Sequence, residues 1–351
     1  MQSASESTRK LPAPVAKGLF PGYFAFTMAT GIVATAADLS GVPALGYAMF
    51  AIASVGYVWL LSLTVWRAIF YWQDLLGDFR NFARGPGFFT MVAATSVLAA
   101  ASIRLFRWHD LALGLWIFGL AIWTVFIYGF ALSAITSEDK PPVERAVNGS
   151  WLIIVVATQS LSIVGSLLST WHKAPWIYPL ATAFFMLGCG LYLLLISVVT
   201  MRLLFRPVQA PLLTPLYWIL MGSAAISTLA GVELDRHASA WPFQINAQPV
   251  LQGFTLFFWI AATGWIPLLV LLGVWRHAVK RHSFEYEPQL WSVVFPLGMY
   301  SVATYSLSSN FKLSFLIPIA QVFMVLAMFV WLLTFSGLTV TTLRSVRSRR
   351  N

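Results

Sequence analysis

Short clusters of small and hydroxyl residues recur along the chain, and their side chains are the first candidates for chemistry. The clusters are Ala29-Thr30-Gly31, Ala94-Thr95-Ser96, Ala157-Thr158-Gln159-Ser160, Ala225-Ile226-Ser227 and Ala303-Thr304-Tyr305-Ser306. They recur at intervals of roughly 70 residues, which is the length of two long helices with their loops. Uncharged hydroxyl donors in a ring could hold an anion loosely, as conduction requires. The alternative is that small residues only let helices pack closely.

The sequence offers little support for acid–base catalysis or metal binding. Cys189 is the only cysteine, so an intrachain disulfide and a multi-cysteine metal site are excluded. Glu233, Asp235 and His237 form a compact cluster that we interpret as a solvated loop. We therefore expect no catalytic residue, no metal and no cofactor, and we expect that the protein is not an enzyme. A membrane-embedded enzyme or accessory subunit is the alternative, and only the Glu233–His237 cluster would serve it.

The composition indicates where these residues must sit. Of 351 residues, 59% are hydrophobic and 10% are charged, whereas soluble domains carry about 25% charged residues. So few charges cannot cover a soluble surface, which excludes most soluble enzymes, disordered chains and secreted disulfide scaffolds. The net charge of +10 is best explained by basic cytoplasmic loops of a membrane protein rather than by nucleic-acid binding.

Ten apolar stretches are long enough to span a bilayer, which needs about 20 residues each. They cover 21–40, 46–72, 86–103, 111–136, 149–170, 175–201, 213–232, 249–275, 290–309 and 313–341. The fold class is therefore predicted as all-α integral membrane. Residues 1–20 form an N-terminal cytoplasmic tail, 21–341 the transmembrane domain, and 342–351 a basic cytoplasmic C-terminal tail.

The positive charges predict the orientation of these spans. Of the 22 Lys and Arg residues, only five fall on one side of the ten-span arrangement, and the other seventeen fall on the side of both tails. The five are Arg104, Arg107, Lys173, Arg236 and Lys312. Because cytoplasmic loops carry the excess of Lys and Arg, both termini are expected in the cytoplasm.

The odd-numbered spans differ from the even-numbered ones in a way that predicts two rings of helices. Odd spans carry the small and hydroxyl clusters, whereas even spans are crowded with Leu, Phe and Trp that suit lipid contact. Five hairpins, each with one inner and one outer helix, would then surround a narrow pore. No charged residue falls at the middle of a span, which argues against a carboxylate proton relay or a voltage-sensing arginine.

Prolines mark the same inner helices. Pro21, Pro86 and Pro215 fit the first turn of a helix, where proline is favoured. Pro296 lies deeper in its span, where the missing backbone donor frees a carbonyl and favours a kink. Freed backbone groups and positive helix ends could contribute to anion binding in such a pore.

Two motifs resemble a known family. They are Phe20-Pro21-Gly22-Tyr23-Phe24 in the first span and Trp291-Ser292-Val293-Val294-Phe295-Pro296-Leu297-Gly298 in the ninth, the latter continuing into Ser301-Val302-Ala303-Thr304. Together with ten spans in five hairpins, they resemble the tellurite-resistance/dicarboxylate transporter family, which includes plant slow anion channels, fungal malate permeases and fungal sulfite pumps. The chain departs from the channel-like members at Ala25 and Thr27, where they often have glycine and proline.

The resemblance implies a set of functional residues. Phe295, with the neighbouring Pro296, matches a phenylalanine that plugs the pore, although core packing alone would also explain a buried phenylalanine. The residues expected to line the pore are Ala25, Thr30, Gly31, Thr95, Thr158, Ser227 and Thr304.

The resemblance also implies the cargo and the setting. The cargo would be small inorganic anions passing through a gated pore, or C4-dicarboxylates such as malate moved by a secondary, proton-coupled carrier. The protein would lie in the plasma membrane, the inner membrane of a bacterium, as a homotrimer.

Overall fold

A computed structural model describes residues 13–172, 174–283 and 285–348 of the chain. Within those ranges the secondary structure is helical throughout, so the prediction of an all-α membrane protein is confirmed. Several residues that support the orientation argument lie outside the described ranges: Arg9, Lys10, Lys173, Arg349 and Arg350. Most of the predicted N-terminal tail (1–20) lies outside them too.

Five buried helices form the inner layer, and each begins with a short 3-10 turn. The pairs of turn and helix are η1 (Pro21–Phe24) with α2 (Ala25–Leu39), η2 (Gly85–Phe88) with α5 (Phe89–Phe106), η3 (Gly149–Leu152) with α8 (Ile153–His172), η5 (Pro215–Trp218) with α10 (Ile219–Arg236), and η8 (Pro288–Leu290) with α12 (Trp291–Phe311). The first-turn prolines Pro21, Pro86 and Pro215 lie where the sequence predicts them. Pro296 lies inside α12.

Five longer helices form the outer layer. They are α3 (Pro43–Phe70), α6 (His109–Thr136), α9 (Ile177–Phe205), α11 (Pro242–Val274) and α13 (Ile317–Ser348), and α11 continues into the π-helical turn η7 (Trp275–Val279). Their membrane-spanning segments are only 17 to 39% buried, against 83 to 94% for the inner segments of α5, α8, α10 and α12. Large apolar side chains such as Trp59, Ile135 and Leu204 are exposed on them, as contact with lipid requires.

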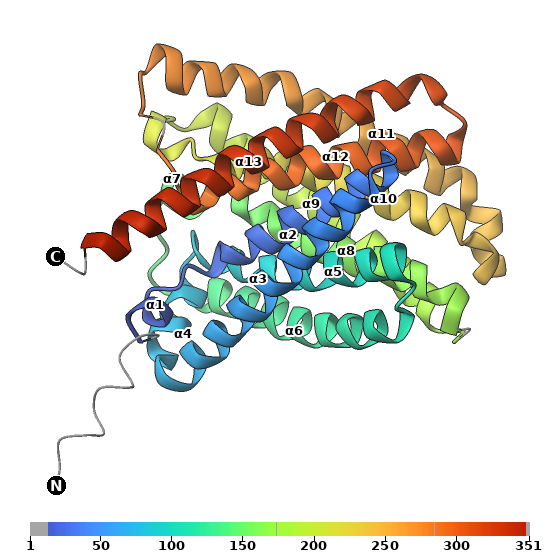
Figure 1. The fold of residues 1–351 in the computed structure, drawn as a ribbon, viewed down its shortest axis with the longest axis horizontal. Helices are drawn as coiled ribbons and strands as arrows, with labels where there is room; N and C mark the ends of the chain where they lie inside the picture. The colour runs from blue at the N-terminus through green and yellow to red at the C-terminus, as the bar shows by residue number, and fades with distance from the viewer. Residues whose placement is uncertain (1–12, 173, 284, 349–351) are drawn as a thin grey trace, which may run out of the picture.

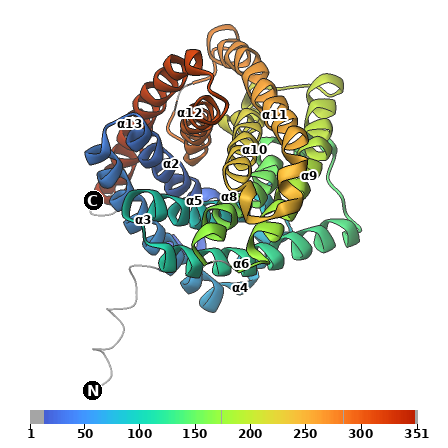
Figure 2. The ribbon, with the colours of Figure 1, turned by 90° about the vertical axis from the view of Figure 1, so that its right-hand side faces the viewer.

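The inner helices form a closed ring. Contacts run from α2 to α5, α8, α10 and α12 and back to α2, and each outer helix packs against its own inner helix and against the next one in the ring. Figure 2 shows the five inner helices toward the centre with the outer helices around them. Because inner and outer helices alternate along the chain, all five inner helices run in the same direction.

The number of spans is close to the predicted ten. In the described part of the chain, nine helices are long and apolar enough to cross a membrane. The first inner helix, α2 with η1, is shorter, yet it completes the ring between α5 and α12. Figure 1 shows α1 (Ala13–Lys17) and the end of α13 at the same end of the bundle, as an even number of crossings would place them.

The loops differ more from the sequence prediction than the spans do. The loop left between the predicted spans 213–232 and 249–275 is much shorter in the structure, because α10 runs on to Arg236 and α11 begins at Pro242. Trp241-Pro242 starts that helix, since proline suits a first helical turn. Two short helices, α4 (Trp72–Arg80) and α7 (Val143–Ala146), lie in connections that the sequence analysis left without structure.

Candidate functional site

The ring of inner helices has a cavity at each end. At the start of the inner helices lies the N-end vestibule, a cavity of about 420 Å³ whose lining includes Phe20, Arg84, Asn148, Arg202, Tyr217 and Gln289. At the other end lies the C-end vestibule, a cavity of about 300 Å³ lined from all five inner helices by residues that include Thr35, Arg104, Leu167, Glu233 and Ser306. The two cavities are the two mouths of the ring.

The N-end mouth is narrowed by the five 3-10 turns. Each turn contacts its neighbours, so that η1, η2, η3, η5 and η8 form a closed ring of their own. The turns meet backbone to backbone: a Cβ atom added to Gly149 would clash with the carbonyl oxygen of Leu216, and one added to Gly87 would lie 3.1 Å from the nitrogen of Gly22. Behind the turns remains a space of only about 10 Å³, on the order of a single water.

Phe295 lies between the two vestibules and is fully buried. On the same helix, Ser292 lines the small space behind the turns, and Val302 and Ser306 line the C-end vestibule. A helix has 3.6 residues per turn, so Phe295 shares the face of Val302 and Ser306, two and three turns further on. That face is the one directed at the ring axis.

Pro296 points away from that axis. A Cβ added to Gly222 of α10 would lie 2.8 Å from Cγ of Pro296, so the glycine makes room for the proline ring. The α10–α12 contact therefore depends on this pair. The proline anchors one side of α12 while the neighbouring phenylalanine occupies the face toward the axis.

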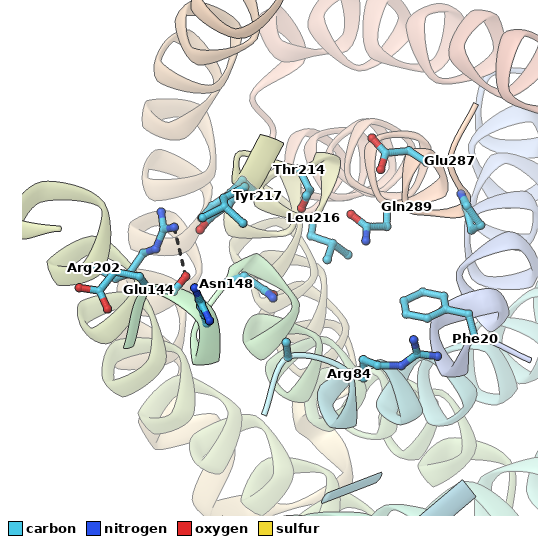
Figure 3. A pocket seen from close by; sticks show the side chains of 14 residues that line it. Phe20, Arg84, Glu144, Asn148, Arg202, Thr214, Leu216, Tyr217, Glu287 and Gln289 are labelled. Atoms are coloured by element: carbon cyan, nitrogen blue, oxygen red, sulfur yellow. Dashed lines mark hydrogen bonds between the residues drawn. The ribbon is translucent and has the colours of Figure 1, made fainter. Parts of the chain in front are cut away.

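The electrostatics of the N-end vestibule favour an anion. All five inner helices direct their N-terminal ends there, and each helix start carries roughly half a positive elementary charge. Its lining also includes three arginines, Arg84, Arg145 and Arg202, against two glutamates, Glu144 and Glu287. Figure 3 shows Arg202 and Tyr217 on one side of the cavity, with Arg84 and Phe20 across from them.

Two ion pairs lie at the C-end vestibule, whose lining also includes Arg107. Nε of Arg104 donates to Asp38 at 3.2 Å, joining α5 to α2. Arg236 donates to Oε1 of Glu233 at 2.9 Å, and Glu233 is only 5% exposed. The carboxylate of Glu233 therefore lies in the wall of the C-end vestibule rather than in the solvated loop that the sequence predicted.

The other members of the Glu233–His237 cluster join helices. Asp235 accepts hydrogen bonds from Asn310 at 2.6 Å and from Gln252 at 3.1 Å. Nδ1 of His237 lies 3.3 Å from the hydroxyl oxygen of Ser166 in α8 and 2.7 Å from the carbonyl oxygen of Glu233. Across the described ranges, no group of three His, Cys, Asp or Glu residues is arranged to hold a metal ion.

All four threonines expected to line the pore form hydrogen bonds with aromatic side chains of outer helices. The hydroxyls of Thr30, Thr158 and Thr304 accept hydrogen bonds from the indole nitrogens of Trp331, Trp123 and Trp259, at 2.9, 2.9 and 3.0 Å. The hydroxyl of Thr95 lies 2.6 Å from that of Tyr57. These hydrogen bonds join the two layers in four places. A pore-lining role for the four threonines stays a prediction, and the hydrogen bonds to outer helices do not favour it.

The remaining predicted residues are buried in the inner layer. Gly31 provides room for Val97 of α5, since an added Cβ would lie 2.7 Å from its methyl carbon. The Ser227 hydroxyl donates to the carbonyl oxygen of Ser223 within α10. Ala25, at the start of α2, is 3% exposed. No contact distinguishes Ala25 or Ser227 as lining residues.

Three buried arginines at the end of the bundle that holds the N-end vestibule were not predicted from the sequence, and one of them, Arg202, lines that vestibule. Arg67, Arg202 and Arg276 each lie at the end of an outer helix and are 4, 1 and 7% exposed. The sequence assigned them to span ends and loops, because an arginine that follows an apolar stretch is usually solvated. Their recurrence at the ends of three even-numbered spans is the signal that could have identified them.

A comparison with known sequences decides the family. The voltage-dependent anion channel family (SLAC1) matches residues 19–339, which is nearly the whole transmembrane region. The chain belongs to this family. The resemblance found in the two proline motifs is confirmed, and anion transport across a membrane is the activity that the family indicates.

Two individual relatives are named as a membrane protein and as a transporter. The uncharacterized membrane protein Rv1735c of Mycobacterium tuberculosis is 40% identical over 162 residues, which is 45% of this chain and 82% of the relative. The uncharacterized transporter MJ0762 of Methanocaldococcus jannaschii is 22% identical over 332 residues, which is 91% of this chain and 93% of the relative.

Proposed function

We propose that the protein is a gated pathway for small anions through the ring of inner helices, with Phe295 as the gate. The observation that carries the proposal is the position of Phe295 on the axis-facing side of α12, between the cavities at the two mouths. An apolar ring in a narrow, dry segment blocks an ion, because the ion would lose its water there without gaining donors.

The two mouths support an anion rather than a cation as the permeant species. The lining of the N-end vestibule holds three arginines and two glutamates, and the five helix N-terminal ends add to this positive excess, which raises the local concentration of anions. The two glutamates, Glu144 and Glu287, are paired with Arg206 and Arg276, so they do not form an acidic ring of the kind that selects cations.

The gate is tested by Phe295→Ala in proteoliposomes loaded with chloride or nitrate. Removing the ring should raise anion flux by at least roughly tenfold, which corresponds to about 1.4 kcal/mol of barrier. Phe258→Ala is the matched control, since Phe258 is equally buried but lies on the outer helix α11. Unchanged flux through well-folded Phe295→Ala, or an equal rise in both variants, would refute the gate.

A proton-coupled carrier of C4-dicarboxylates is the second candidate, and one observation favours it. Glu233 supplies a nearly buried carboxylate in the wall of the C-end vestibule, and carboxylates in such positions often carry protons in transporters. A carrier would show saturable malate uptake driven by a pH gradient, and Glu233→Gln would abolish that dependence. A channel would conduct without the gradient.

The setting of the protein belongs to the same proposal. We place it in the plasma membrane, the inner membrane of a bacterial cell, with both termini in the cytoplasm and as a homotrimer. A single new cysteine in the C-terminal tail should react with an impermeant maleimide only after the cells are opened, because a cytoplasmic tail is out of the reagent's reach. Cys189 should not contribute to the signal, since it is buried. Tellurite resistance is a further expectation, tested by growth of a deletion strain on tellurite.

A further inference from the structure

Three outer helices end in a buried arginine, but only two of these arginines have a carboxylate partner. Arg67 donates to Asp78 at 2.8 Å, and Arg276 donates to Glu287 at 3.4 Å. In both pairs the acidic residue follows the arginine by 11 positions. The residue at the same offset from Arg202 is Leu213, so the third arginine lacks the carboxylate that its counterparts have.

The contacts of Arg202 leave most of its charge uncompensated. Its Nη2 atom donates to the backbone oxygen of Glu144 at a long 3.4 Å, and its guanidinium lies 5.8 Å from the ring centre of Tyr217. The Glu144 carboxylate is paired with Arg206 at 3.3 Å. Nε and Nη1 of Arg202 are buried and make no hydrogen bond to any described residue. A buried charge in this state is costly unless a counter-ion joins it.

Two further polar side chains beside Arg202 also lack partners. The hydroxyls of Tyr217 and Thr214 are buried and make no hydrogen bond within the described part of the chain. Both residues line the N-end vestibule together with Arg202, and Tyr217 and Arg202 lie on the same side of it in Figure 3. Each of the three side chains can donate a hydrogen bond, so the wall is complementary to a group rich in acceptors.

We propose that Arg202, Tyr217 and Thr214 form a binding site for an oxyanion, such as a carboxylate or nitrate, that loads the pathway from the N-end vestibule. The inference rests on the proposed anion pathway. An oxyanion fits better than a halide because its several oxygens accept from donors that converge from a helix end, a 3-10 turn and the loop before it. The site lies at the mouth toward which the inner helix N-termini point.

Binding is measured on the full-length protein in detergent by equilibrium dialysis with labelled nitrate and, separately, labelled malate. Arg202→Gln should weaken binding by about tenfold or more, the usual cost of losing a charge-assisted hydrogen bond. Tyr217→Phe should weaken it by roughly threefold while keeping the ring. Arg80→Gln is the matched control, since it removes the same charge from an exposed side chain at the same end of the bundle, outside the described lining of the vestibule.

Unlabelled anions test the class of ligand. Excess nitrate or malate should displace the label at a much lower concentration than chloride does. Equal displacement by chloride would overturn the oxyanion assignment. Binding to Arg202→Gln as tight as to the wild type would overturn the site. If Arg202→Gln elutes as an aggregate, Tyr217→Phe decides, and unchanged binding in that variant overturns the site as well.

Flux into proteoliposomes separates this site from the pathway itself. Arg202→Gln should raise the half-saturating anion concentration by about tenfold with little change in maximal rate, and Arg80→Gln should leave both unchanged. A wild-type protein that binds nitrate through Arg202 but carries no anion would refute the pathway and leave the site standing. Flux with an unchanged half-saturation in Arg202→Gln would refute the site and leave the pathway standing.

Discussion

The two mouths of the ring are built differently although the same five helices form both. At the C-end vestibule, Asp38 pairs with Arg104 and Glu233 pairs with Arg236. At the N-end vestibule, the helix N-terminal ends add to a buried guanidinium, that of Arg202, whose charge no described carboxylate neutralises. The side chains of both linings include acids and bases, so the mouths differ in the helix N-terminal ends and in the unpaired charge of Arg202 at the N-end mouth.

The difference teaches how a ring of nearly identical hairpins gains a direction. Because every inner helix runs the same way, the positive ends of all five helix dipoles gather at the N-end mouth and the negative ends at the other. Basic side chains near the C-terminal helix ends, Arg104 and Arg236, offset the negative helix ends at the C-end vestibule, and their carboxylate partners keep that mouth from becoming an anion trap. An anion should therefore accumulate at the N-end mouth and leave easily from the other.

The largest effect on stability is expected from forcing a methyl group into the backbone contact between two turns at the N-end mouth. Gly149→Ala would place a Cβ against the carbonyl oxygen of Leu216, and overpacking of this kind costs about 3 kcal/mol. We expect a clear fall in thermal stability in detergent. Gly190→Ala, on the outer helix α9, is the control, because no atom lies within 4 Å of its added Cβ. Equal stability of the two variants would mean that the turns do not close the mouth.

A smaller effect is expected from removing a negative charge at the C-end mouth, which makes its potential more like that of the N-end mouth. Glu233→Gln removes the carboxylate that compensates Arg236, so anion flux from the C-end side should rise by about threefold through local concentration of anions. Asp110→Asn removes an exposed carboxylate at the same end of the bundle, outside the described lining of the vestibule, and should change nothing. Loss of flux in Glu233→Gln would instead favour the proton-coupled carrier.

The smallest effect is expected between the mouths, where the threonines join the layers. Thr95→Val removes the 2.6 Å hydrogen bond to Tyr57 and should cost about 1 kcal/mol of stability without changing the relative flux of chloride, nitrate and malate. Thr124→Val is the control, since that hydroxyl is exposed and bonds only within α6. A changed anion preference in Thr95→Val would restore this residue to the lining of the pathway.

The sequence predicted the two layers because the outer helices contact lipid whereas the inner helices contact one another. Lipid favours the bulky apolar residues of the outer helices, and close approach of inner helices favours glycine, alanine and hydroxyl residues. That pattern does not say which side of an inner helix faces the axis, since both sides are small and weakly polar. Thr30 and Thr158 were therefore assigned to the pore, whereas their hydroxyls accept from Trp331 and Trp123.

The candidate site was predictable only in part for a related reason. Phe295 was singled out by its place before Pro296, and the helical phase of α12 directs it to the axis. Arg202 was missed because its burial depends on α9 packing against η3 and α10, which no local pattern reveals. Long-range contacts decide whether an arginine at a span end is solvated or enclosed.

The closure of the ring also constrains how the chain is made. The hydroxyl of Thr30, in the first inner helix, meets the indole of Trp331 in the last outer helix, 301 residues later. While the chain is being synthesised, α2 is therefore exposed on the side that α12 and α13 will cover. The ring can close only after the last hairpin has inserted. Until then α2, the shortest of the inner helices, lacks its contacts with the final segment of the chain.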